Sequence, residues 1–130
     1  MLGTNDLKTR FDPSVDKIAG NIARLVDTFA GMRFGNGPWA DAPAPSVGVI
    51  APVPLGQQAD DPNWERYPEW FGARAISCAL FQDLKDRLSV PVLDAGGFAS
   101  ASPRDPIHFE PDQHENRGQG IAEWMRSDAW

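Results

Sequence analysis

The chain has 130 residues, of which 42% are hydrophobic and 23% are charged. That length suits one domain with a single core, and that composition is typical of globular proteins, which excludes wholesale disorder. The net charge of −6 and the interleaving of basic residues with carboxylates argue against nucleic acid as a partner.

The N-terminal segment, MLGTNDLKTRF, lacks the apolar core of a signal peptide. No apolar run elsewhere in the sequence is long enough to span a membrane. We therefore expect a cytoplasmic protein that has no membrane partner.

A first helix is predicted to begin near residue 12 and to end near residue 31. Asp12 is the expected N-cap, Pro13 fits the first helical position, and Gly31 is the expected terminator. Its apolar residues recur at helical spacing: Val15, Ile18, Ile22, Leu25, Val26 and Phe29. Residues 31–45 form a loop by composition.

The run SVGVIA at 46–51 predicts a short strand that is buried on both faces. Pro52 and Pro54 end this strand, because proline cannot donate to a sheet ladder. A second loop is expected over residues 55–67.

The next helix is predicted to start near Pro68 and to run to about Leu88. One stripe carries its apolar residues: Ala73, Ile76, Leu80, Leu84 and Leu88. Cys78 is the single cysteine, so no disulfide can form within the chain. It lies in an apolar stretch, and we expect a buried structural thiol.

The run VPVLDA at 90–95 predicts a second buried strand, which the loop GGFASASPR follows. A last helix is expected from about Pro111 to Arg126. Gly120 should weaken that helix by about 1 kcal/mol relative to alanine.

Alternating helices and strands with these loop lengths predict an α/β fold with parallel strands. Two strands are fewer than the five or so of a typical sheet. Met1 and Leu2 resemble the tail of a third strand, so we expect Met1 to be an internal residue and 1–130 to be a partial domain. Because unpaired strand edges promote association, a homo-oligomer is also expected.

Three loops should leave strands at the same edge of the sheet, where ligands of open α/β sheets bind. They are GTND at 3–6, APVPLGQQ at 51–58 and AGGFASASPRDPIH at 95–108. The chemically active side chains are therefore expected to gather at this rim.

The sequence DPIH at 105–108 places a carboxylate three residues before an imidazole. Pro106 restricts the backbone of Asp105, which favours a tight turn. Asp105 could then accept a hydrogen bond from His108 Nδ1 and leave Nε2 as a general base for a hydroxyl nucleophile. On spacing alone, the favoured alternative is that the pair only structures its loop.

The sequence GTND at 3–6 follows an apolar strand end. Gly3 permits a sharp turn, and the side-chain NH2 of Asn5 could donate to a developing oxyanion. An ordinary turn, in which Asn5 and Asp6 cap backbone groups, is the alternative that this motif alone favours.

Together, in this order and α/β context, GTND and DPIH resemble blocks of the SGNH (GDSL-type) ester hydrolases, including arylesterases. The strand exit APVPLG and the segment VLDAG at 92–96 also resemble that family. The resemblance implies Asn5 as an oxyanion-hole donor, Asp105 as the orienting acid and His108 as the general base. It also implies a small acyl ester substrate, near Pro54 and Leu55, and no cofactor.

The fold that this resemblance implies is a flavodoxin-like, doubly wound parallel sheet of which the N-terminal strands are missing. The family's G-D-S block with the nucleophilic serine is absent from residues 1–130, as is the block with the oxyanion-hole glycine. We therefore expect the polypeptide to be inactive alone. Two alternatives stay open: a non-catalytic interaction remnant of the same fold, and an unrelated small α/β binding module.

A metal site is a further alternative for the segment after the second strand. Its potential ligands are His108, Glu110, Asp112 and His114, but their spacing fits no standard zinc pattern. We expect no metal there. The five tryptophans, at 39, 64, 70, 124 and 130, could line an acyl pocket but are more typical of a core.

Overall fold

The structure is a computed structural model, and it describes residues 3–32 and 46–127. Its helices and strands are α1 (Val15–Gly31), β1 (Val49–Ala51), α2 (Arg74–Arg87), β2 (Val92–Asp94) and α3 (Pro111–Arg126). No helix in the described ranges is long and apolar enough to cross a membrane. The cytoplasmic location stays a prediction.

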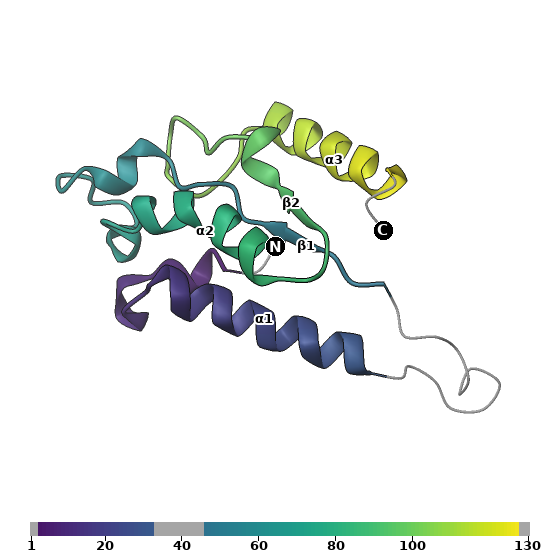
Figure 1. Cartoon of the computed structure of the whole chain (residues 1–130). Helices are drawn as coiled ribbons and strands as arrows, with labels where there is room; N and C mark the ends of the chain where they lie inside the picture. The colour runs from purple at the N-terminus through teal and green to yellow at the C-terminus, as the bar shows by residue number, and fades with distance from the viewer. Residues whose placement is uncertain (1–2, 33–45, 128–130) are drawn as a thin grey trace.

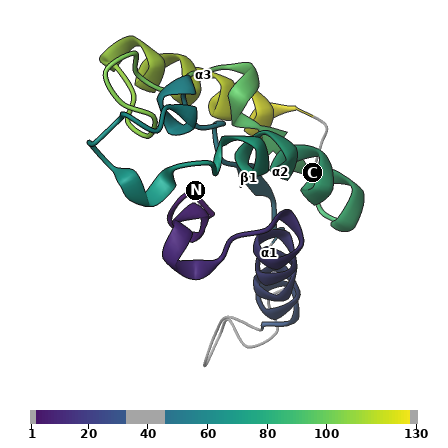
Figure 2. The same cartoon turned by 90° about the vertical axis from the view of Figure 1, so that its left-hand side faces the viewer.

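The two strands are parallel and pair in the register Val49 with Val92, Ile50 with Leu93 and Ala51 with Asp94. Helices α1 and α2 pack on each other and α2 packs on both strands, whereas α3 contacts the turn after β2. Figures 1 and 2 show α1 and α3 on opposite sides of the strands. The predicted α/β class with parallel strands is confirmed, and the complete flavodoxin-like sheet stays a prediction.

Helix α1 begins after Ser14, whose side chain accepts a hydrogen bond from the N–H of Lys17 at 3.2 Å. The prediction of Asp12 as N-cap is wrong, because Asp12 adopts a left-handed conformation (φ 48°) and its carboxylate binds Lys17 Nζ instead. The helix ends at Gly31 as predicted. Of the predicted loop that follows, residues 33–45 lie outside the described residues, as do Met1 and Leu2.

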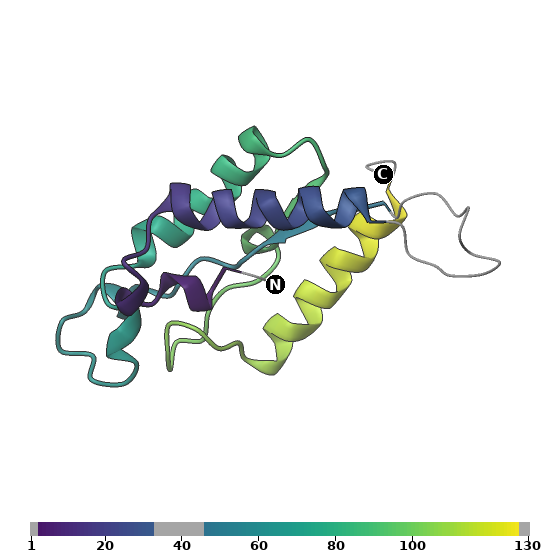
Figure 3. The ribbon, with the colours of Figure 1, turned by 90° about the horizontal axis from the view of Figure 1, so that it is seen from below.

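Only part of the predicted apolar stripe of α1 is buried. Ile18, Ile22 and Val26 face the core, whereas Leu25 and Phe29 are 42% and 45% exposed. In the view from below, α1 lies in front of β1 (Figure 3). The groove between α1 and the segment around β1 is apolar and has a volume of about 260 Å³.

Helix α2 begins at Arg74, six residues later than predicted, because Gly72 interrupts the segment with a left-handed conformation (φ 75°). Residues Pro68–Trp70 form a separate 3-10 turn. The expectation of a buried thiol is wrong: Cys78 is exposed. It follows Ser77, which is on the buried face, and one residue rotates a helix by about 100°.

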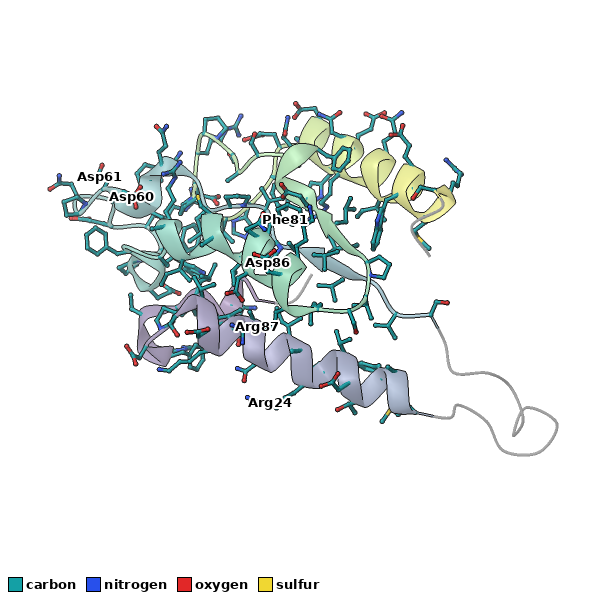
Figure 4. The ribbon with its side chains drawn as sticks, viewed as in Figure 1. Arg24, Asp60, Asp61, Phe81, Asp86 and Arg87 are labelled. Carbon is teal, nitrogen blue, oxygen red and sulfur yellow. The ribbon has the colours of Figure 1, made fainter. Side chains whose placement is uncertain are left out.

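Helix α2 presents Ser77, Leu80 and Leu84 to the core. The hydroxyl of buried Ser77 accepts from the N–H of Leu55 at 2.9 Å and donates to the carbonyl of Arg74 at 2.7 Å. On the other side, Arg87 of α2 (Figure 4) binds Asp16 of α1 at 2.6 Å, so α2 ties the strand-exit loop to α1.

Both strands are shorter than the predicted 46–51 and 90–95, whereas α3 has the predicted bounds. Gly120 of α3 is buried against the ring of Phe98, which lies in the loop after β2. A Cβ at position 120 would come within 2.5 Å of that ring. Gly120 therefore lets the loop that leads to DPIH pack against α3.

Candidate active site

The DPIH segment forms a compact turn around a buried carboxylate. Asp105 is 6% exposed, and its Oδ1 accepts from the N–H groups of Ile107 at 2.9 Å and of His108 at 2.7 Å. His108 Nδ1 lies 3.1 Å from both carboxylate oxygens of Asp105. The predicted pairing of Asp105 with His108 Nδ1 is thus present in the structure.

Neighbouring loops hold this turn at its backbone. The carbonyl of Pro106 accepts from the N–H of Gly56 at 3.0 Å, and the carbonyl of His108 accepts from the N–H of Ser102 at 2.7 Å. Pro106 itself is fully buried. The loops after β1 and β2 therefore meet at the Asp105–His108 turn.

Burial acts to raise the pKa of Asp105, but the hydrogen bonds from the N–H groups of His108 and Ile107, and from the imidazole, outweigh it and lower this pKa. Asp105 therefore stays ionised at neutral pH. The imidazole of His108, by contrast, is 62% exposed. A buried carboxylate that holds Nδ1 of an exposed imidazole leaves Nε2 as the ring nitrogen available for proton transfer.

An aromatic pair connects His108 with the GTND segment. The Tyr67 ring lies against His108, with ring centroids 5.7 Å apart, and meets the Trp70 ring edge-on at 6.1 Å. Trp70 Nε1 donates to the carbonyl of Thr4 at 3.0 Å. No motif in the sequence points to Tyr67; the only local signal is Pro68, which restricts the backbone of Tyr67 as Pro13 restricts that of Asp12.

Asn5 is exposed and begins a 3-10 turn, Asn5–Leu7. Gly3 precedes it with φ 108°, a conformation that favours glycine, beside Ile18 and Pro52. No hydrogen bond joins Asn5 to Asp105 or His108 within residues 3–32 and 46–127. The structure brings Asp105 and His108 together, and links the Asn5 segment to them through Trp70 and Tyr67.

Pro54 and Leu55, the predicted substrate-binding residues, line an open groove of about 580 Å³. Leu55 is 3% exposed, while Pro54 is half-buried and packs beside Gly96. The groove runs between the loops after β1 and β2, and Arg74 at the start of α2 also lines it. Arg74, which pairs with Asp60 at 3.5 Å, was not identified from the sequence.

The residues weighed as metal ligands make other contacts. The His114 ring meets Phe109 edge-on at 5.4 Å, and Glu110 accepts from the Ser102 hydroxyl at 2.6 Å. In the described part of the chain no three His, Cys, Asp or Glu side chains gather as a metal-binding group. Among the tryptophans, Trp70 is buried in the core, and Trp39 and Trp130 lie outside the described residues.

Comparison with known proteins gives no match to a family model and none to a curated protein sequence. Among solved structures, a carbohydrate acetylesterase from Sinorhizobium meliloti is 32% identical, with a TM-score of 0.81 over 96% of this chain and 57% of that one. The native aryl esterase of M. smegmatis is 31% identical, with a TM-score of 0.82 over 97% of this chain and 58% of that one.

The chain thus spans less than three fifths of the length of these two structures. The similarity extends over nearly all of its own length and joins sequence identity to a shared fold. The predicted resemblance to the SGNH, arylesterase-like ester hydrolases is therefore confirmed, for a chain that matches part of an esterase of this kind.

Proposed function

We propose that residues 1–130 form the base-bearing part of a serine carboxylic-ester hydrolase. In this proposal His108 is the general base, Asp105 orients it, and Asn5 donates to the oxyanion. The observation that carries the proposal is the Asp105–His108 pair, in which a buried carboxylate engages Nδ1 of an exposed imidazole. The solved esterase structures support the same reading.

The proposed reaction has two stages. A serine hydroxyl attacks the ester carbonyl while His108 Nε2 takes its proton, and the NH2 of Asn5 stabilises the oxyanion. The protonated imidazole then gives its proton to the departing alcohol, which leaves an acyl-enzyme. Water or another alcohol, activated by His108 in turn, releases the acyl group by hydrolysis or transfer.

The nucleophile is the part that this polypeptide does not supply. None of its seven serines stands in a G-D-S sequence. Several of the described serine hydroxyls make other contacts: that of Ser77 donates to the carbonyl of Arg74, and that of Ser102 donates to Glu110. We therefore propose that residues 1–130 alone are inactive, because removing the nucleophile of such a unit removes nearly all of its rate advantage.

A chimera tests the catalytic reading. It joins the N-terminal segment of the M. smegmatis aryl esterase, which this proposal expects to carry the nucleophilic serine, ahead of Gly3. The substrate is p-nitrophenyl acetate, since an aryl acetate suits both an acetylesterase and an aryl esterase. The chimera should hydrolyse this ester, whereas residues 1–130 should not exceed the background rate. A folded chimera without activity would contradict the proposal.

The second candidate is a non-catalytic interaction piece of the same fold. The observation that favours it is the apolar groove beside α1, where Leu25 and Phe29 are largely exposed. We propose that this surface drives self-association, since an exposed apolar patch marks an interaction site. In sedimentation experiments Phe29→Lys should reduce association, while Asp27→Lys, on the exposed face of the same helix, should not.

A further inference from the structure

The imidazole of His108 needs more than Asp105 to fix its orientation. Asp105 holds the ring at Nδ1 alone, with both carboxylate oxygens at 3.1 Å. The ring turns by rotation about its Cα–Cβ and Cβ–Cγ bonds, and a single contact at Nδ1 restrains this rotation only in part, so Nε2 can still shift. Since His108 is 62% exposed, the packing around the ring leaves it much freedom. A second contact against the ring would restrict this rotation and help to place Nε2.

Tyr67 provides such a contact. Its ring lies 5.7 Å from the His108 ring, centroid to centroid, at an angle of 58° between the planes. Aromatic pairs at this separation attract each other, and a flat neighbour restricts how far the imidazole can pivot. Tyr67 comes from the long loop between β1 and α2, so the contact is independent of the DPIH turn.

The backbone of Tyr67 is held in an unusual conformation. Its φ of 74° and ψ of 51° are left-handed, a region that a bulky residue rarely adopts. Such a conformation persists only where its surroundings determine it, and it is frequent at functional sites. Pro68 follows Tyr67 and disfavours the right-handed helical alternative.

Trp70 is a second aromatic neighbour of the Tyr67 ring. Trp70 meets it edge-on at 6.1 Å, is itself 6% exposed, and donates from Nε1 to the carbonyl of Thr4. The backbone N–H of Trp70 also donates to the carbonyl of Tyr67 at 3.2 Å. Trp70 thereby links Tyr67 to the GTND segment, which carries Asn5.

We propose that Tyr67 is a positioning residue, which sets the orientation of the His108 imidazole relative to the segment that carries Asn5. This inference rests on the proposed function, because it assigns Tyr67 a role in the reaction of His108. Tyr67 touches no reacting atom and acts only through the imidazole that it contacts.

Three substitutions separate the ring of Tyr67 from its backbone. Tyr67→Phe keeps the ring face. Tyr67→Asn and Tyr67→Gly remove it but tolerate the left-handed conformation, so neither should unfold the loop. In the chimera, Tyr67→Asn should lower kcat about 10- to 100-fold with little change in KM, since small misplacements of catalytic groups cost up to about 100-fold. Tyr67→Phe should stay within about twofold of the parent.

The deciding experiment uses NMR of the 130-residue chain and needs no turnover. The chain has two histidines, so its imidazole signals are few. In the parent and in Tyr67→Phe, His108 should show NOEs to the residue-67 ring and the ¹⁵N pattern of a single tautomer with hydrogen on Nδ1. In Tyr67→Asn, the His108 side-chain couplings should become averaged between orientations, while His114, packed on Phe109, should not change.

Two results would overturn the inference. One is the absence of NOEs between the rings of Tyr67 and His108 in the parent chain, which requires no variant to fold. The other is unchanged His108 couplings in Tyr67→Asn or Tyr67→Gly. If instead these NMR results are as expected and the chimera does not hydrolyse esters, the proposed function fails while the contact that positions His108 stands.

Discussion

The DPIH turn and the GTND turn, the two motifs of the candidate site, are held in different ways. Asp105 is buried and binds two backbone N–H groups and the imidazole of its own turn. Asn5 is exposed, and its turn is closed by backbone hydrogen bonds such as that from the N–H of Asp6 to the carbonyl of Gly3 at 3.1 Å. The DPIH turn is therefore held by contacts within itself, whereas the position of the GTND turn depends on the elements packed around it.

This difference explains why the two motifs contribute differently to the proposed site. A self-contained turn brings the acid and the base together wherever the loop lies. The proposed oxyanion donor, Asn5, must instead be placed across the fold, and Trp70 Nε1 links its segment to the rest of the rim by donating to the carbonyl of Thr4. Substitutions in DPIH should therefore remove chemistry, whereas substitutions around GTND should weaken alignment.

The largest expected effect comes from the self-contained motif. In the chimera, His108→Ala should lower kcat on p-nitrophenyl acetate by on the order of 10⁶-fold, and Asp105→Ala by about 10⁴-fold, as in other serine hydrolases. The control is His114→Ala, which removes the other histidine of the chain. A His108→Ala enzyme with near-parental kcat would show that DPIH is only a structural turn.

The second motif should contribute less. Asn5→Ala in the chimera should lower kcat by roughly 10²–10³-fold, which is the contribution of one oxyanion-hole donor. Asp6→Ala is the control, because Asp6 is an exposed neighbour in the same turn. Equal kcat values for the two variants would mean that Asn5 does not donate to the oxyanion.

A pair of glycines tests how the DPIH loop is anchored to α3. In Gly120→Ala the new Cβ would press on the Phe98 ring, while at Gly118 nothing lies within 4 Å. Overpacking costs about 1–3 kcal/mol and should outweigh the gain of up to about 1 kcal/mol in helix propensity. Denaturant unfolding should therefore show Gly120→Ala to be less stable than the parent and Gly118→Ala to be more stable. The opposite order would show that Phe98 does not pack tightly against Gly120.

The smallest expected effect is the pH dependence of stability that comes from Asp105. Because folding lowers the pKa of this carboxyl, its stabilisation is complete above its ordinary value of 3.8 and is lost as the pH falls through the lower, folded value. The unfolding free energy of the chain should thus decline in acid. In the Asp105→Asn variant this decline should be shallower than in the control variant Asp27→Asn, whose substitution lies on the exposed face of α1. Equal pH profiles of stability in the two variants would show that Asp105 does not contribute to the decline.

Periodicity and local turn chemistry could predict most of the elements. The bounds of α3 and the end of α1 at Gly31 follow from local signals, and the parallel pairing of the strands follows from the alternation of helices and strands along the chain. The start of α2 could not be predicted, because it depends on Gly72, whose N–H binds the distant carbonyl of Ala59 at 2.8 Å. The exposure of Cys78 depends likewise on which face of α2 the tertiary packing buries.

The candidate site shows the same division. The pairing of Asp105 with His108 is a contact over three residues, and the sequence predicts it. The contact of Tyr67 with His108 spans 41 positions, and that of Trp70 with Thr4 spans 66. No short motif specifies contacts at such separations, because they depend on where the long loop between β1 and α2 lies against the rim.

Activation of a serine by His108 can be measured as the rate at which a fluorophosphonate probe labels that serine, since this rate reports the reactivity of the nucleophile itself. Residues 1–130 should not be labelled, and the chimera should be labelled stoichiometrically at its G-D-S serine. His108→Ala should slow this labelling by orders of magnitude, and His114→Ala should not. Labelling of a serine in residues 1–130, or equal labelling rates with and without His108, would contradict the account.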